Sequence, residues 1–91
     1  MNEQGKAELK RLLVSGLDNT LESQAELLKT AVENQARNSS EGLSVLTKSA
    51  ADLLVAAGLV RYDGKYENLH STEFCYMPTE EGKRVYNLLF R

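Results

Sequence analysis

The sequence has little of several residue types, and each shortage excludes a class of structure. Its 91 residues include one cysteine, Cys75, so the chain cannot form an intramolecular disulfide or a zinc site built from cysteines. It has no tryptophan, one proline and two phenylalanines, so its core must consist mainly of leucine, valine and alanine. A lone free thiol fits a reducing compartment, and we expect a cytoplasmic protein.

Positive charge and long apolar runs are also scarce. Eleven Lys and Arg residues against thirteen Asp and Glu residues give a net charge of −2, whereas nucleic-acid-binding domains more often carry a basic surplus. The longest apolar run, residues 53 to 57, is far shorter than the ~20 residues needed to cross a bilayer. The first residues lack the apolar stretch of a secretory signal. We therefore expect no membrane contact.

The overall composition is that of an ordinary globular domain. Hydrophobic residues make up 42% of the chain and charged residues 26%. A chain of this length holds a single modest core, so we expect one domain over residues 1–91.

Three segments have the apolar spacing of amphipathic helices, namely residues 3 to about 16, 20 to 36 and 43 to 57. The stripe of the third is Leu46, Ala50, Leu53 and Ala57. Gly58 follows where a left-handed residue ends a helix, and Leu59 is placed for the hydrophobic contact of a Schellman cap. Residues 43 to 57 are thus predicted to be a helix that stops at Gly58.

The period then changes from helix to strand. Residues 59 to 62 and 73 to 77 are short, β-prone and partly aromatic. Asp63-Gly64 suits a tight hairpin turn, which would make residues 65 to 69 a separate strand. A longer two-stranded ribbon with a polar tip at residues 68 to 72 is the other interpretation. A last helix should follow Thr79, a good N-cap with two acids after it.

The stretches "LTKSAADLLVAAGLVRY" and "YMPTEEGKRVYNLL" resemble the winged helix of the MarR type of bacterial transcription regulators. The matching residues are Gly58, Leu59, Val60 and Arg61, followed by Thr79, Gly82 and Lys83. The resemblance covers residues 43 to 91. It implies a mainly α fold with a small antiparallel β-ribbon, a winged helix-turn-helix. Pro78 stands where that family usually has leucine, and the chain lacks room for the family's long dimerisation helices.

The resemblance favours a small DNA-binding transcriptional regulator, with helix 43–57 in the major groove and ribbon 59–77 as the wing. Base edges would be read from the outward face of the helix, by Ser44, Thr47 and Lys48. Phosphates would be contacted by the turn before the helix and by the wing, through Arg37, Asn38, Ser40, Arg61 and Lys65. A homodimer on double-stranded DNA is the expected assembly.

The acidic balance supports an alternative, a protein-protein interaction module on the same fold that modulates a larger regulator or a polymerase. Asp52 interrupts the cations of the predicted helix, and Asp63 and Glu67 offset those of the wing. Candidate contacts with another protein or a second copy are Ala51, Val55, Leu88 and Phe90.

Catalysis and cofactor binding have little support. One histidine, His70, and one cysteine do not form a metal site or a nucleophile with its base. Cys75 is expected to be an inert residue in an apolar strand. No glycine-rich phosphate loop is present. We expect neither an enzyme nor a bound cofactor or metal.

Overall fold

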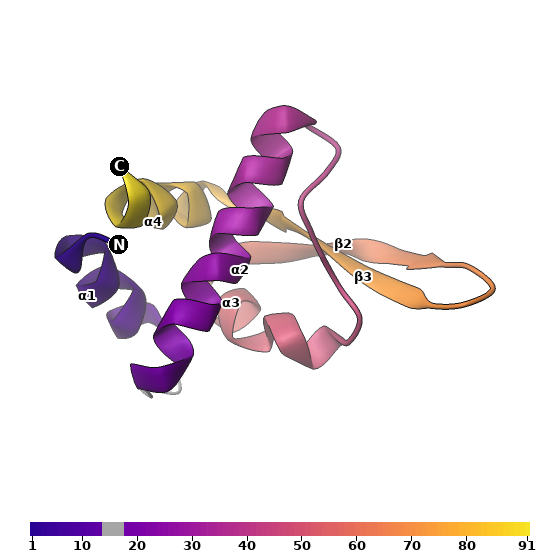
Figure 1. The fold of residues 1–91 in the computed structure, drawn as a ribbon, viewed down its shortest axis with the longest axis horizontal. Coiled ribbons are helices and arrows are strands. Elements are labelled where there is room, and N and C mark those ends of the chain that lie inside the picture. The colour runs from indigo at the N-terminus through magenta and orange to yellow at the C-terminus, as the bar shows by residue number, and fades with distance from the viewer. Residues whose placement is uncertain (14–17) are drawn as a thin grey trace.

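The computed structural model describes residues 1–13 and 18–91. Its elements are α1 (Glu3–Leu12), α2 (Asp18–Arg37), β1 (Leu43–Val45), the 3-10 helix η1 (Lys48–Ala51), α3 (Asp52–Ala56), β2 (Val60–Glu67), β3 (Thr72–Pro78) and α4 (Glu80–Phe90). Figure 1 shows a helical body from which the β2–β3 hairpin projects. The fold is mainly α with a small antiparallel sheet, as expected. The predicted end of the first helix near Gly16 lies outside the described residues, and α1 itself ends at Leu12.

The core lies between the helices and one face of the sheet. Its largest fully buried side chains are Leu9, Leu28, Leu54, Leu59, Val85, Leu89 and Tyr76. α1 and α4 approach closely, because a Cβ at Gly5 would lie 2.5 Å from the backbone of Leu88 and Leu89. The two chain ends meet there (Figure 1), where the Asn2 amide donates to the Leu89 carbonyl oxygen at 2.8 Å.

The sheet has the order β1-β3-β2, and both pairings are antiparallel. Leu43 of β1 lies opposite Tyr76 of β3, and both join the core on the inner face. The next residues along β3 in each direction, Cys75 and Met77, point to the outer face because strand side chains alternate. The third strand, β1, is an addition to the two-stranded ribbon that the sequence predicts.

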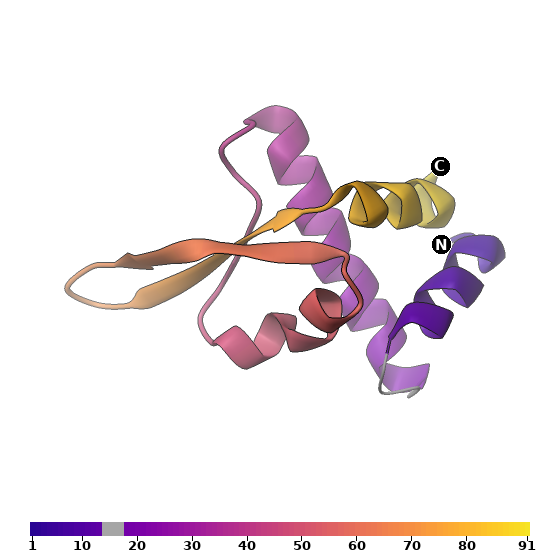
Figure 2. The same cartoon turned by 180° about the vertical axis from the view of Figure 1, so that it is seen from behind.

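The hairpin turns at its tip rather than at Asp63-Gly64. Gly64, with φ of +123°, sits in β2 beside a break in register between Tyr62 and Gly64, so the dipeptide forms a β-bulge. At the tip the Asn68 side-chain oxygen accepts from the amides of His70 at 2.8 Å and Ser71 at 2.9 Å. The longer ribbon with a polar tip is confirmed, and the turn at Asp63-Gly64 is wrong. Figure 2 shows the length of this hairpin from behind.

The predicted helix over residues 43 to 57 is wrong in its first half. Residues 43–45 form β1, and the helical segment begins only at Lys48 in η1 and continues through α3. Leu46, assigned to the buried stripe, is 69% exposed, whereas Ala51 and Leu54 are fully buried. The free edge of β3 explains the change, because pairing with it satisfies the backbone of residues 43–45 and buries Leu43.

Both predicted caps are confirmed. Gly58 has φ of +76°, its amide donates to the Val55 carbonyl oxygen at 3.0 Å, and the Leu59 amide donates to that of Leu54 at 2.9 Å. These two bonds are the Schellman pattern. The Thr79 hydroxyl accepts from the Gly82 amide at 3.0 Å and caps α4.

Candidate functional site

The three residues predicted to read base edges do not share a helix face. Ser44 lies on β1 opposite Cys75, Thr47 precedes η1 as its N-cap, and Lys48 is the first residue of η1. All three side chains are exposed. The predicted arrangement of a single reading helix over residues 43 to 57 is therefore corrected to a strand, a cap position and one helical residue.

Lys48 is engaged with the base of the hairpin. Its ammonium nitrogen lies 4.5 Å from the centroid of the Tyr62 ring, a cation–π contact. The Tyr62 ring in turn meets the Tyr76 ring edge-on, with 5.5 Å between centroids. Burial, followed by the charge of Asp52, raises the pKa of the Tyr76 hydroxyl above its ordinary value. The Lys48 ammonium group thus lies over the Tyr62 ring, which itself packs against the core residue Tyr76.

The two cations of the hairpin are each paired with an acid two residues further along β2. Arg61 contacts Asp63 at 3.0 Å and Lys65 contacts Glu67 at 3.1 Å. Arg61 lies opposite Met77 and Lys65 lies opposite Phe74, three positions apart on β3, so the two cations point to opposite faces of the sheet. They do not form one basic surface.

The turn after α2 uses its polar groups internally. The Asn38 side-chain oxygen accepts from the amide and the hydroxyl of Ser40, at 3.1 Å and 2.9 Å, and Arg37 donates to the Asn34 side chain. The end of α2 and the η1 segment lie on opposite sides of the hairpin in both ribbon views (Figures 1 and 2). The predicted phosphate contacts of the turn are therefore apart from Lys48.

The predicted protein contacts divide into exposed and covered residues. Val55 is 41% exposed, but Ala51 is fully buried, so its assignment to a contact surface is wrong. Leu88 and Phe90 are half-buried at the end of α4. The Phe90 ring lies 5.3 Å from that of Tyr86, and the Lys29 ammonium lies 5.6 Å from the Phe90 centroid. Most of the apolar surface of Phe90 thus packs within the chain.

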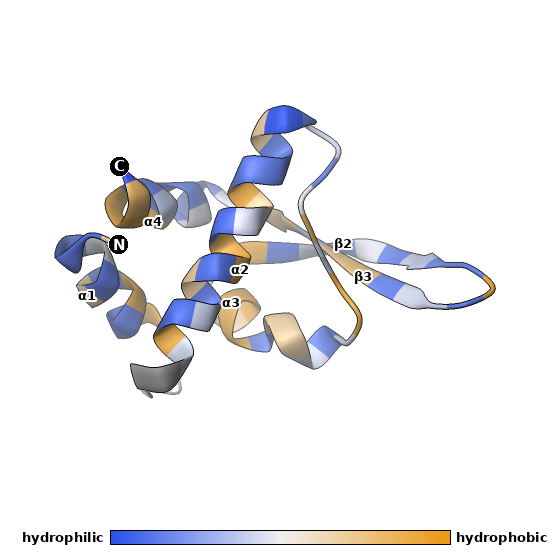
Figure 3. Ribbon diagram, viewed as in Figure 1, coloured by the Kyte–Doolittle hydropathy of each residue, from blue (hydrophilic) through white to orange (hydrophobic). Residues whose placement is uncertain are grey.

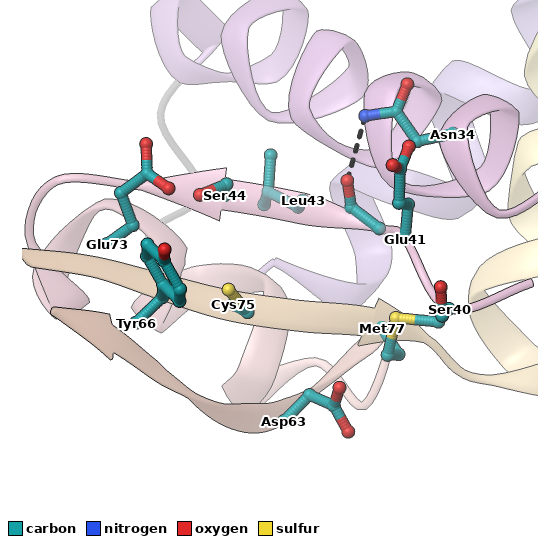
Figure 4. Close-up of a pocket in the computed structure, with 11 residues that line it drawn as sticks. Asn34, Ser40, Glu41, Leu43, Ser44, Asp63, Tyr66, Glu73, Cys75 and Met77 are labelled. Atoms are coloured by element: carbon teal, nitrogen blue, oxygen red, sulfur yellow. Dashed lines mark hydrogen bonds between the residues drawn. The ribbon is translucent and has the colours of Figure 1, made fainter. Parts of the chain in front are cut away.

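A groove of about 480 Å³ lies on the outer face of the sheet (Figure 4). Cys75 and Met77 of β3 line it together with Ser44 of β1 and with Asp63 and Tyr66 of β2. Met77 is buried yet stands apart from the main core. Cys75 is half-buried rather than enclosed, so the expected inert thiol in fact borders a surface groove.

The connection between α2 and β1 forms one wall of the groove. The Asn34 side-chain amide donates to the Gly42 carbonyl oxygen at 2.8 Å, a bond drawn in Figure 4. A Cβ at Gly42 would lie 2.3 Å from the Tyr76 carbonyl oxygen and 2.8 Å from the Met77 sulfur, so only glycine permits this approach. The wall is held against β3 by backbone packing and a side-chain bond.

Acidic side chains border the groove. Glu41, Asp63 and Glu73 are among the lining residues, and no lysine or arginine of the described ranges lines the groove. Asp63 is paired with Arg61, while Glu41 and Glu73 make no ion pair within the described part of the chain. Sequence reasoning missed this site. The usable signal was the alternation Glu73, Cys75, Met77 along one face of a strand.

Within residues 1–13 and 18–91, no group of three or more His, Cys, Asp or Glu side chains converges to hold a metal ion. No helix in these ranges is both long and apolar enough to span a bilayer.

The chain matches no known family model, and neither the curated proteins nor the solved structures contain a match. The resemblance to MarR-type regulators therefore stays a prediction.

Proposed function

We propose that this chain is a protein-protein interaction module that uses its projecting hairpin and the outer face of its sheet. The observation that carries the proposal is the pairing of Arg61 with Asp63 and of Lys65 with Glu67. Each cation available to bind phosphate on the hairpin is neutralised by an acid of the same strand. Protein contacts do not need the basic surplus on which nucleic-acid affinity mainly depends.

The charge balance of the hairpin supports this choice. Residues 60 to 78 contain two cations, Arg61 and Lys65, and three acids, Asp63, Glu67 and Glu73, which gives −1 with His70 neutral. The two cations also point to opposite faces of the sheet. A phosphate backbone laid along either face would meet at most one of them and at least one carboxylate.

The shape of the hairpin supports it as well. Tyr66 is 61% exposed and Leu69, at the tip, is 97% exposed. Figure 3 shows the tip as a hydrophobic point at the end of mostly polar strands. The two bonds that the Asn68 oxygen accepts from backbone amides hold the tip in one conformation, so less conformational entropy is lost on binding. Exposed tyrosine is typical of the energetic centre of protein interfaces.

DNA binding is a second candidate, with one observation in its favour. A short helix ending at Gly58 leads into a projecting hairpin, and a helix capped by Thr79 follows, which is the order of elements in a winged helix. In this proposal Thr47, the N-cap of η1, and Lys48, its first residue, would face the major groove, and the hairpin would serve as the wing of a homodimeric regulator.

Two experiments separate the candidates. Titration with mixed-sequence duplex DNA at about 50 mM salt, where electrostatic binding is strongest, tests the second. Saturable binding that weakens with salt would support it and contradict our first choice.

For the first, a photo-crosslinking residue is placed at Leu69 and, as a matched control, at Glu22, which is exposed on α2. We expect a discrete protein adduct from position 69 in the source cell, absent from position 22 and reduced by Tyr66→Ser. Equal adducts from both positions, or none, would overturn the proposal.

A further inference from the structure

We infer that the outer-face groove receives a basic side chain, an arginine or lysine of a partner protein. Its apolar stem lies over Cys75 and Met77, and its charged head lies at the carboxylate of Glu73, at the end of the groove where Tyr66 also lies. The inference rests on the proposed function and names the partner chemistry of one surface of the module.

The sheet builds the floor of the groove. Along β3, Glu73, Cys75 and Met77 alternate onto the outer face, and Ser44 of β1 and Tyr66 of β2 lie opposite Cys75 and Glu73. The floor therefore presents a thiol and a thioether, with an exposed aromatic ring at one end. The stems of arginine and lysine cover apolar surface of this kind while the charged group stays at the rim. The Tyr66 ring also offers a face for a guanidinium group.

The rim selects the sign of the partner's charge. Among the residues that the structure describes, three acids and no lysine or arginine line the groove. Arg61, opposite Met77 on the same face, is already paired with Asp63 at 3.0 Å. The carboxylates of Glu41 and Glu73 are without an ion-pair partner within the described residues. An arriving cation would pair with Glu73, and Glu41, at the other end of the groove (Figure 4), adds to the negative potential. Phosphate or an acidic segment would be repelled.

The size of the groove fits a side chain rather than a whole element. A volume of about 480 Å³ lies in the range of pockets that hold small ligands. The methionine sulfur is polarizable and adapts to the shape of what it contacts. The wall held by Asn34 and Gly42 is already in position, so little rearrangement is needed on binding.

The test is a titration of the ¹⁵N-labelled chain with the tripeptide acetyl-Gly-Arg-Gly-amide, followed by amide chemical shifts. The control peptide replaces arginine by citrulline, its neutral isostere. We expect saturable shifts centred on Tyr66, Glu73 and Cys75, with a Kd on the order of 1 mM, because a single side chain provides few contacts. The citrulline peptide should bind at least about tenfold more weakly. Equal shifts with both peptides, or no saturable shift up to about 50 mM arginine peptide, would overturn the inference.

Two single substitutions in the hairpin, each of which removes one negative charge, test whether the arginine peptide binds at the groove. Glu73→Gln removes a rim carboxylate and should weaken the arginine peptide by about three- to tenfold. Glu67→Gln should leave the Kd unchanged. Glu67 lies opposite Thr72, the neighbour of Glu73 on β3, so its carboxylate is on the other face of the sheet. Equal weakening would mean diffuse attraction to an acidic protein and would contradict a built site.

The Cys75 thiol supplies a second readout. Alkylation of this half-buried thiol by iodoacetamide should slow in the presence of the arginine peptide and not in the presence of the citrulline peptide. If the crosslinker at position 69 still forms its protein adduct but the groove does not bind the arginine peptide, this inference fails and the proposal of an interaction module is retained. If the groove binds arginine and no adduct forms at position 69, the hairpin proposal fails instead.

Discussion

The hydroxyl of Thr79 donates a hydrogen bond to the carbonyl oxygen of Gly58 at 2.6 Å. Gly58 lies two residues before Val60, the first residue of the hairpin, and Thr79 immediately follows its last residue, Pro78. The Thr79 amide adds a bond to the Leu59 carbonyl oxygen at 3.0 Å. The end of α3 and the start of α4 are thereby joined, and the base of the projecting hairpin is closed by these bonds.

Replacement of Thr79 should destabilise the fold. Thr79→Ala removes both the cap of α4 and the bond to Gly58, and we expect a loss of about 1–2 kcal/mol in the free energy of unfolding. Thr79→Ser keeps the hydroxyl and should stay within about 0.5 kcal/mol of the parent. Urea denaturation measures both. An alanine variant as stable as the parent would contradict the role of this hydroxyl.

Gly82 should not tolerate even a methyl group. A Cβ there would lie 2.0 Å from the Leu59 carbonyl oxygen, which belongs to the backbone. We expect Gly82→Ala to cost about 1–3 kcal/mol, although alanine is favoured over glycine inside a helix by about 1 kcal/mol. The control Asn87→Ala, at an exposed position of the same helix, should not destabilise. A Gly82→Ala variant that is more stable than the parent would show that α4 does not pack against Leu59 this closely.

Glu8 should make stability depend on pH in the acid range. Its carboxylate accepts from Arg11 at 2.6 Å and from Arg84 at 3.1 Å, and these bonds lower its pKa below 4.5. A lowered folded-state pKa means that the stabilisation is present above the ordinary pKa and is lost as pH falls through the folded pKa. Glu8→Gln should therefore be less stable than the parent at neutral pH, with the difference vanishing toward about pH 2.

The control for this experiment is Glu22→Gln, which removes an exposed acid of α2. Unfolding curves recorded at several pH values compare the three proteins. A gap between Glu8→Gln and the parent that stays constant down to about pH 2 would refute the ion-pair explanation.

Tyr86 should ionise late in alkaline titration. Its hydroxyl donates to the Glu33 carboxylate at 2.8 Å, and this bond, together with burial, raises its pKa above 10.0. The raised pKa stabilises the fold below pH 10 and the contribution is lost as pH rises through the folded pKa. Tyrosinate absorbance should show a late component that Tyr86→Phe removes and Glu33→Gln moves toward pH 10. A Glu33→Gln titration identical to the parent would exclude the bond as the cause.

Sequence patterns that depend only on neighbouring residues correctly predicted the ends of two helices. The stop at Gly58 and the cap at Thr79 were predicted because each depends on residues within a few positions along the chain. Residues 43–45 could not be predicted as a strand, because their apolar spacing also fits a helix and their partners, residues 74–76, are distant in sequence. The Asp63-Gly64 dipeptide was misleading for the same reason, since β3 continues opposite it and absorbs it as a bulge.

The candidate site required the register of the sheet. The bulge between Tyr62 and Gly64 inserts one residue into β2, so Arg61 and Lys65, four positions apart, face opposite sides. The groove likewise joins the α2–β1 connection to both strands of the hairpin. Which acids gather at its rim depends on these long-range pairings and on the approach of Gly42 to Tyr76.

The amino-acid sequence by itself determined the mainly helical class, the single small core and the caps at Gly58 and Thr79, because each follows from composition or from neighbours along the chain. Only the tertiary structure decided that residues 43–45 complete a sheet, that the hairpin cations separate, and that an acidic groove forms over Cys75 and Met77. These features arise from pairing between strands, and the residues of one strand do not by themselves specify its partner or the register of the pairing.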